Sequence, residues 1–415
     1  MKKITTLLTA IIGMAFMNQV SATHVTVEVP TAGQLSSLVQ NANCDSITIS
    51  GNLDGNDFWF IREQMPNLIY LNIGKVTVPD NKLPESGLYS KKALQKIILP
   101  DNLGTIGNHA FAYCSNLKDI TFPKSLVTIE YNAFYQSGLT EATLPDKLKN
   151  IGDAAFYECY NLKKVNFPEK LVSIGNSAFR QCNLSEIAFP DSLKAIGSNA
   201  FRYCQQLQKV TFPEKLETIG THAFNDCFRL HTATLKGKTA PVISDNTFNY
   251  TKVFYVPEGA AQTYKEAPNW SNLVIIDGNT PKKITVTLTT AGTLGEEILK
   301  QVDYVKQVNE LVINGPLNSD DFYQIQQQTT NLIAIDLIGA TIESLPENFF
   351  YERTALLDIK LPATLKNIGR YAFYRCHGLT QITIPEGVTN VGDYAFSECI
   401  SLKEIELPTT LTDIK

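Results

Sequence analysis

One unit of sequence recurs through this chain and constrains its fold more than any other feature. A representative copy reads Leu117-x-x-Ile120-x-Phe122-Pro123-x-x-Leu126-x-x-Ile129, followed by Ala133-Phe134. Its proline recurs in steps of 22 or 23 residues, at positions 100, 123, 145, 168, 190 and 213, and again at 362, 385 and 408. A fixed period of this length predicts a solenoid, in which each coil packs on its neighbours and the stack buries one continuous core.

Each position that recurs in the unit has a physical explanation. The L-x-x-I-x-F segment predicts a short strand with alternate side chains pointing inward, and the proline after it ends the strand. An Ile-Gly pair follows in most copies and indicates a left-handed or otherwise crowded bend. Together these features predict a mainly β protein, a leucine-rich-repeat solenoid with a curved parallel sheet and short helices in its caps.

Two further columns are predicted to be structural. The first stacks one ring from each repeat: Phe111, Phe134, Phe156, Phe179, Phe201, Phe224, Phe373 and Phe396. The second lies three residues later: Cys114, Cys159, Cys182, Cys204, Cys227, Cys376 and Cys399, with Ser137 in the repeat that lacks a cysteine. Because one coil cannot bury these groups alone, both columns are expected to form the core between stacked coils.

The cysteine column permits three interpretations. An exported chain favours disulfides, but stacked residues that point the same way have poor geometry for bridging. Zinc requires ligand spacings such as C-x-x-C or paired histidines, which are missing here. We therefore favour a ladder of buried thiols, which pack as small hydrophobic groups.

The N-terminus has the pattern of an export signal. Lys2 and Lys3 precede an apolar stretch, and the small residues up to Ala22 suit cleavage there. The apolar stretch is shorter than the 18 or so residues that span a membrane. Cleavage would take the net charge from −5 to −7, which argues against nucleic acid as a partner. We expect a secreted or cell-surface protein without a transmembrane segment.

The chain reads as two tandem copies of the same unit, because the lead-ins match. Thr-Ala-Gly at 31–33 recurs at 290–292, and Asp57-Phe58 matches Asp321-Phe322. The predicted boundaries are a signal peptide at 1–22, an N-terminal cap with irregular repeats at 23–96, the first repeat array at 97–235, its C-terminal cap at 236–277, a linker at 278–283, a second cap with irregular repeats at 284–349, and a second repeat array at 350–415. Short helices are expected after Gly33, Asp57, Gly292 and Asp321.

The second array stops within a repeat. Pro408 opens a copy that ends at Lys415, before its glycine, phenylalanine and cysteine. An uncapped solenoid exposes apolar surface, so we expect a truncated product, a hypothesis that the mass of the native secreted protein would test.

The sequence contains no motif of catalysis. None of the patterns typical of metalloproteases, serine hydrolases, nucleotide-binding loops or dinucleotide folds occurs. His109 and His222 lie in a polar outer column and are interpreted as structural. The stretch from Asp54 to Asp57 is the best metal candidate, but it falls short of the calcium-loop pattern and fits a helix N-cap better. We predict no enzyme activity, no metal and no cofactor.

The consensus C-x-x-L-x-x-I-x-L-P-x-x-L-x-x-I-G-x-x-A-F resembles the BspA-like, or treponemal, type of leucine-rich repeat over residues 94–235 and 350–415. The segment from Val256 to Trp270 resembles the end piece of such arrays. The resemblance implies a bacterial surface or secreted protein that adheres to host proteins or other cells. A protein partner is therefore expected, with a glycan at the cell surface as the alternative.

Two surfaces are candidates for binding. The concave strand face carries two outward columns with mixed charges and small polar groups: Lys96, Asp119, Thr121, Glu141, Thr143, Lys164, Asn166, Glu186, Lys209 and Thr211. Solenoids commonly bind through such a face, although cross-strand charge pairs merely facing solvent would look the same. The opposite side carries an aromatic and arginine stripe: Tyr113, Tyr135, Tyr157, Arg180, Arg202, Tyr203, Tyr374 and Arg375. We favour a covering role for the stripe.

Overall fold

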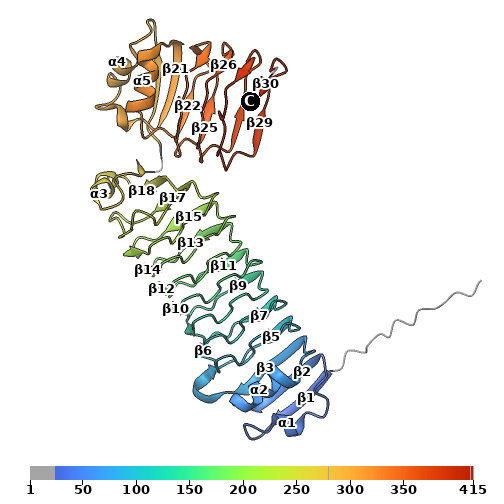
Figure 1. Ribbon diagram of the computed structural model, residues 1–415. Helices are drawn as coiled ribbons and strands as arrows, with labels where there is room; N and C mark the ends of the chain where they lie inside the picture. Colours follow the sequence, from blue (N-terminus) through green and yellow to red (C-terminus); the bar gives the residue numbers. More distant parts are fainter. Residues whose placement is uncertain (1–23, 279, 412, 415) are drawn as a thin grey trace, which may run out of the picture.

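The computed structural model describes residues 24–278, 280–411 and 413–414. The expected signal peptide, with Lys2, Lys3 and the cleavage site near Ala22, lies outside this range. Figure 1 shows a ladder of stacked coils that runs from the blue N-terminal end to the yellow region, followed by a second ladder in orange and red. We call residues 24–277 the first unit and residues 283–414 the second unit. Each unit has its own buried hydrophobic cluster.

The first unit begins with longer strands and two helices. Its opening elements are β1 (His24–Val29), α1 (Leu35–Leu38), β2 (Ser46–Asn52), α2 (Gly55–Gln64), β3 (Tyr70–Thr77) and η1 (Pro79–Asn81). The three strands pair in parallel and in chain order. As predicted, a helix follows Gly33. The helix predicted to follow Asp57 is α2, which begins two residues before Asp57.

Most of the following coils carry two strands, one more than the sequence pattern indicates, while the last three coils of the first unit carry one. The first set lies at the L-x-x-I-x-F segments: β5 (Lys96–Ile98), β7 (Asp119–Thr121), β9 (Glu141–Thr143), β11 (Lys164–Asn166), β13 (Glu186–Ala188), β15 (Lys209–Phe212), β17 (Thr232–Leu235), β18 (Val253–Val256) and β19 (Val274–Asp277). The second set lies at the Thr-Ile or equivalent pairs: β4 (Lys82–Leu83), β6 (Thr105–Ile106), β8 (Thr128–Ile129), β10 (Asn150–Ile151), β12 (Ser173–Ile174), β14 (Ala195–Ile196) and β16 (Thr218–Ile219). All pairs are parallel and most join equivalent residues of successive coils. Helix α3 (Ala261–Glu266) lies between β18 and β19.

The second unit repeats this plan. Its elements are β20 (Lys283–Thr287), α4 (Leu294–Leu299), η2 (Val305–Gln307), β21 (Glu310–Pro316), α5 (Ser319–Tyr323), η3 (Gln324–Gln328), β22 (Ala334–Asp336), β23 (Ala340–Thr341), β24 (Ser344–Leu345), β25 (Asp358–Lys360), β26 (Asn367–Ile368), β27 (Gln381–Thr383), β28 (Asn390–Val391), β29 (Glu404–Glu406) and β30 (Asp413–Ile414). The strands again pair in parallel, in the order β20-β21-β22-β25 on one side and β24-β26-β28-β30 on the other. The mainly β, leucine-rich-repeat solenoid predicted from the sequence is therefore confirmed.

The phenylalanine column forms the centre of the core. The rings of Phe134 and Phe156 are 5.1 Å apart with an interplanar angle of 6°, and Phe179 stacks on Phe156 at the same spacing. Seven of the eight rings are fully buried, while Phe396 in the last repeat is half-buried. The column therefore makes one aromatic stack in each unit, which links each coil to the next within that unit.

The cysteine column lies beside the stack as buried, free thiols. Cys204 Sγ donates to the carbonyl of Phe179, one coil back, at 3.2 Å, and Cys227 Sγ donates to the carbonyl of Phe201 at the same distance. Ser137, which replaces cysteine in one coil, lies 3.3 Å from Cys159 Sγ. Each thiol thus satisfies a backbone carbonyl of the preceding coil, which rationalises a small side chain with a weak donor at this position.

Crowding, rather than a left-handed backbone, explains the glycine column. The backbone of Gly197 has no positive φ, but a Cβ there would lie 2.6 Å from the nitrogen of Asn176 and from the carbonyl carbon of Gly175. The positive φ values lie elsewhere in the coil, at non-glycine residues such as His109 (φ 55°) and Asn199 (φ 57°). The polar outer column that contains His109 and His222 is therefore a turn position, where short polar side chains tolerate the left-handed region.

We expect Gly197→Ala to destabilise the first unit by about 1–3 kcal/mol, because the added methyl overpacks against the backbone of the neighbouring coil. The matched control is Gly104→Ala, where the nearest atom to a Cβ is the carbonyl oxygen of Asn81 at 3.8 Å. Chemical denaturation of both variants measures the difference. An equal response of the two variants would show that crowding does not select glycine here.

A buried aspartate joins the elements of each N-terminal end. Asp57, 1% exposed, accepts backbone N–H groups from Gly33 at 2.6 Å, Leu35 at 2.9 Å and Asp54 at 3.0 Å. Asp54 is the N-cap of α2 and accepts from the backbone of Asn56 at 2.9 Å and of Asp57 at 3.3 Å. The candidate metal stretch is thus a capping box in this structure, with the N-cap at Asp54 rather than at Asp57.

The second unit has the same arrangement at α5. Asp321 is fully buried and accepts from the backbones of Gly292 at 2.6 Å, Leu294 at 3.0 Å and Asn318 at 3.0 Å. Asn318 takes the N-cap place of Asp54. The two N-terminal ends therefore share one hydrogen-bond arrangement on matching residues.

A cation, buried in the first unit and half-buried in the second, satisfies the opposite end of each of these helices. Lys91 Nζ donates to the carbonyls of Ile61, at 3.0 Å, and Met65, and burial lowers the pKa of Lys91 to about 8. In the second unit Arg353 donates to the carbonyls of Thr329 at 2.9 Å and Gln326 at 2.8 Å. A cation suits the C-terminal end of a helix, where carbonyls lack partners. In both copies of the sequence, a basic residue stands at the same distance after Leu-Pro-Glu, and this pattern could have predicted the cation.

The two units contact each other at the C-terminal end of the first. Val253, Val274 and Ile276 point outward from β18 and β19, yet each is at most 6% exposed. They form a small apolar cluster with Ile333 and the half-buried Leu357 of the second unit. Ile333 and Leu357 immediately precede β22 and β25, so the lateral edge of the second sheet covers the end of the first. We call this contact the junction.

Candidate functional site

The outward side of β5 to β17 forms an open surface, which we call the strand face. Its first column takes the first residue of each strand and its second column takes the third. The ten residues predicted from the sequence all lie on it: Lys96, Asp119, Thr121, Glu141, Thr143, Lys164, Asn166, Glu186, Lys209 and Thr211. Nine of them are exposed, and Thr211 is half-buried. The structure therefore brings them together as one continuous surface.

Opposite charges face each other along the first column. Lys96 lies 2.6 Å from Asp119 across the β5–β7 pair, and exact strand register places Glu141 opposite Lys164 and Glu186 opposite Lys209. Each exposed pair contributes under about 1 kcal/mol to stability. The column thus has little net charge but a fixed order of positive and negative groups, which gives a partner a register to match.

The strand face ends at the junction. In β17 the two columns are occupied by Thr232 and Thr234, and in β18 by Val253 and Tyr255. The change from charged to apolar residues coincides with the place where the second unit covers the sheet. The second unit therefore covers one end of the strand face.

The aromatic and arginine stripe is a self-packed layer of half-buried residues. Tyr135 lies 5.0 Å from Tyr113 and 5.3 Å from Tyr157, measured between ring centroids. The guanidinium of Arg180 lies 5.3 Å from the ring of Tyr157 and 5.5 Å from the ring of Tyr203. Arg202 lies over Tyr203, at 4.7 Å, and in the second unit Arg375 lies over Tyr374, at 5.1 Å.

Ion pairs complete this stripe in both units. Arg202 Nε lies 3.2 Å from Asp226, and Arg375 bridges Glu352 at 3.0 Å and Glu398 at 2.8 Å. Because the rings and guanidinium groups already contact one another, they cover the edge of the core with polar tips in water. This geometry supports the covering role that we favoured.

The cysteines are unsuited to nucleophilic or metal chemistry, since both require the thiolate. Burial raises the pKa of Cys204 to about 12, and it also raises the pKa of Cys159 to about 12 and that of Cys399 to about 11. Within residues 24–278, 280–411 and 413–414, no group of three or more His, Cys, Asp or Glu side chains is arranged to hold a metal ion. The same described part of the chain has no helix long and apolar enough to cross a membrane.

Comparisons with known proteins agree with this architecture. A family described as "BspA type Leucine rich repeat region" matches residues 81–192, 172–273 and 322–415, well over half of the chain. A leucine-rich repeat protein from Bacteroides ovatus is 22% identical, with 94% of this chain and 82% of that chain covered and a TM-score of 0.41. A leucine rich cell surface protein from Faecalibacterium prausnitzii is 21% identical, with the same coverage and a TM-score of 0.37.

The Leucine Rich Repeat protein of T. pallidum is 29% identical, with 39% of this chain and 78% of that chain covered and a TM-score of 0.37. No curated protein matches the chain. The family match covers the stacked coils of both units, including the strands, the phenylalanine column and the cysteine column described above. This chain belongs to the family of BspA-type leucine-rich repeat proteins.

Proposed function

We propose that this chain is a secreted or cell-surface protein that binds another protein through the strand face, without catalysis. The observation that carries the proposal is the continuity of that face. Nine exposed residues from six successive strands lie on it, in register within the pairs β5–β7, β9–β11 and β13–β15, and the second unit bounds it at one end. Extended solenoid faces of this kind commonly bind macromolecules.

The composition of the face favours a protein partner over a glycan or nucleic acid. Its second column is small and polar, with Thr121, Thr143 and Asn166, and it lacks the exposed aromatic platforms on which sugars or bases stack. The first column mixes three positive and three negative side chains, which complements a protein surface of mixed charge and would repel half of the contacts of a uniformly charged polymer. Export is supported by the N-terminal signal pattern in the sequence.

The test swaps charges in the first column without changing the net charge. The double variant Lys164→Glu with Glu186→Lys places like charges opposite Glu141 and Lys209. We expect it to weaken binding to a surface protein identified with the native chain by about tenfold, which corresponds to 1.4 kcal/mol. Surface plasmon resonance at two salt concentrations would measure the loss.

The matched control is the swap Lys194→Glu with Glu217→Lys. These two residues form a 2.9 Å ion pair beside the second set of strands, away from the strand face. This variant should bind as the native chain does. Equal affinity of all three proteins would remove the strand face as the binding site, and binding to a glycan array without any protein partner would overturn the proposed class of partner.

A further inference from the structure

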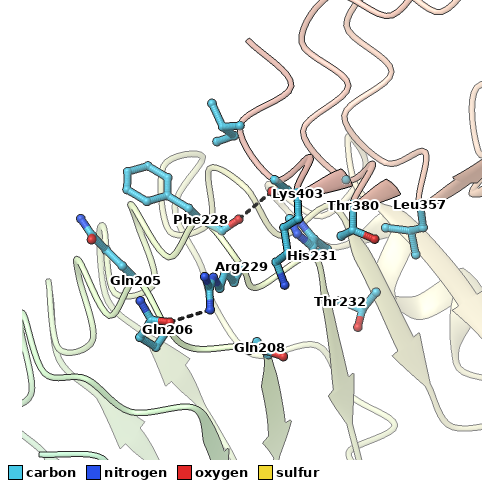
Figure 2. A pocket seen from close by; sticks show the side chains of 13 residues that line it. Gln205, Gln206, Gln208, Phe228, Arg229, His231, Thr232, Leu357, Thr380 and Lys403 are labelled. Carbon is cyan, nitrogen blue, oxygen red and sulfur yellow. Dashed lines mark hydrogen bonds between the residues drawn. The ribbon is translucent and has the colours of Figure 1, made fainter. Parts of the chain in front are cut away.

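A cavity of about 610 Å³ lies at the junction, next to the apolar cluster that joins the two units. The residues just before successive strands of the second unit explain its position. Ile333 and Leu357, before β22 and β25, contact the first unit, and Leu357 also borders the cavity, which Thr380 and Lys403, before β27 and β29, continue to line. The cavity thus opens where the second sheet separates from the first unit (Figure 2).

The lining of this cavity is basic. Arg229 and His231 of the first unit and Lys403 of the second face it, and no aspartate or glutamate is among its lining residues. Neither Arg229 nor Lys403 forms an ion pair with any residue that the structure describes. Two carboxylates of the same coils, Asp226 and Glu398, are paired with arginines. Cations that converge without counter-ions repel one another, and an anion between them would relieve that repulsion.

The other lining residues supply neutral hydrogen-bonding groups and one aromatic ring. Gln205, Gln206 and Gln208 come from the adjacent coil, and Phe228 lies at the rim. Gln206 Oε1 accepts from Arg229 Nη1 at 2.6 Å and so holds the guanidinium in place, as Figure 2 shows. Amides suit hydroxyl groups, which both donate and accept, and an aromatic ring suits the apolar face of a sugar.

Two contacts keep the two sides of the cavity at a set distance. Ser401 Oγ donates to the carbonyl of Phe228 at 3.1 Å, and Tyr250 lies edge-to-face with His377, with ring centroids 5.3 Å apart. A pocket built by contacts between two units, with a volume in the range of about 300–1,000 Å³, is typical of small-molecule sites.

From this geometry we infer that the junction cavity binds a carboxylated sugar, with the carboxylate between Arg229 and Lys403 and the hydroxyls at the glutamine amides. A uronic acid and a sialic acid share this chemistry, either free or at the end of a longer glycan. The cavity adjoins the end of the strand face at Thr232 but does not include Lys164 or Glu186, which the test of that face changes, so either proposal can fail without the other.

Histidine should make the binding dependent on pH. Burial lowers the pKa of His231 to about 4, and the neighbouring His377 and Lys403 add to this effect. Lys252 and Arg229 are the other charged groups beside it, and Glu398 faces His377. A bound carboxylate would raise the pKa of His231, so a proton and the sugar would bind together. Affinity should therefore increase as the pH falls from 7 toward 5, where the carboxylate of the sugar remains ionised.

The experiment measures binding of glucuronate and N-acetylneuraminate to the full chain by calorimetry or saturation-transfer NMR. We expect Arg229→Gln to raise the Kd at least tenfold and Lys403→Gln to raise it several-fold. His231→Gln should remove the increase in affinity at low pH. The matched control is Lys163→Gln, which removes an exposed lysine at the same place before β11 of the first unit and should change nothing.

Additional ligands distinguish the possible causes of binding at this cavity. Methyl glucoside tests whether the carboxylate is required, an oligosaccharide ending in a uronic acid tests a glycan end, and an acidic tripeptide and sulfate test for a general anion site. The inference is overturned if neither acidic sugar binds, if methyl glucoside binds equally well, or if the tripeptide or sulfate matches the sugars. It is also overturned if Arg229→Gln binds like the native chain while Trp270 fluorescence shows that the variant is folded.

Discussion

Asp57→Ala is expected to destabilise the N-terminal end of the first unit by about 3–5 kcal/mol, because three buried backbone donors lose a charged acceptor. The carboxylate of Asp57 reaches Gly33 and Leu35, which precede and begin α1, as well as Asp54 at the start of α2. Its loss would therefore separate two helices that close the end of the core. Chemical denaturation, followed by hydrogen exchange of residues 24–77, measures the effect.

Asp54→Ala provides the comparison for this prediction. Asp54 is a more exposed N-cap that accepts from the backbones of Asn56 and Asp57, and its loss should cost only about 1 kcal/mol. Asp321→Ala should behave like Asp57→Ala, but in residues 283–341. If Asp57→Ala proved no more harmful than Asp54→Ala, the buried carboxylate would not be the element that holds the cap together.

Phe156→Ala is expected to cost about 3–5 kcal/mol, since it removes a fully buried ring and leaves a cavity between coils. Phe156 stacks on Phe134 and Phe179 at 5.1 Å each, so its removal interrupts the aromatic stack in the middle of the first unit. Because each coil contacts only its neighbours, the two halves should then unfold less cooperatively. A broader denaturation transition and faster hydrogen exchange in residues 134–201 would be observed.

The control for the stack is Phe396→Ala. Phe396 is half-buried and stacks on one ring, Phe373, at 5.0 Å, so its truncation should cost less than half as much as that of Phe156. Trp270, which is fully buried at the end of the first unit, should report Phe156→Ala through its fluorescence and be insensitive to Phe396→Ala. Equal costs for the two variants would show that stacking on both sides does not add stability.

The repeat could be read from the sequence because its information is local and periodic. Spacing alone placed the strands at the L-x-x-I-x-F segments, and it placed Phe156 and Cys159 together in columns. It did not show the second strand of each coil, which has only two residues, such as Thr128 and Ile129. A segment this short lacks the alternation by which a strand is recognised.

The choice between two explanations of the glycine column also needed the structure. The sequence showed glycine after isoleucine, which fits either a left-handed backbone or a close approach. The coordinates give Gly197 an ordinary φ and a neighbouring backbone too close for a Cβ. The left-handed residues, such as Asn199, carry side chains, and nothing in the spacing distinguishes them from other turn residues.

For the candidate surfaces, the sequence placed the ten residues of the strand face but gave no sign of where that face ends. The sequence does contain a signal for the end of the face, because the outward positions become apolar at Val253, Val274 and Ile276. From the sequence, however, these residues are interpreted as part of a cap. Only the packing of Ile333 and Leu357 against them shows that they form an interface.

What the sequence by itself determined is the coil: its strand, its core columns and its stacking on the next coil. These depend on nearest-neighbour contacts that repeat every 22 or 23 residues, so one period contains nearly all of the information. What only the tertiary structure decided is the junction and its basic cavity. There Ser401 meets Phe228 across 173 residues of chain, and Arg229 and Lys403 line the same cavity. Contacts between residues so far apart arise from the docking of two completed surfaces, which no periodic pattern within either unit encodes.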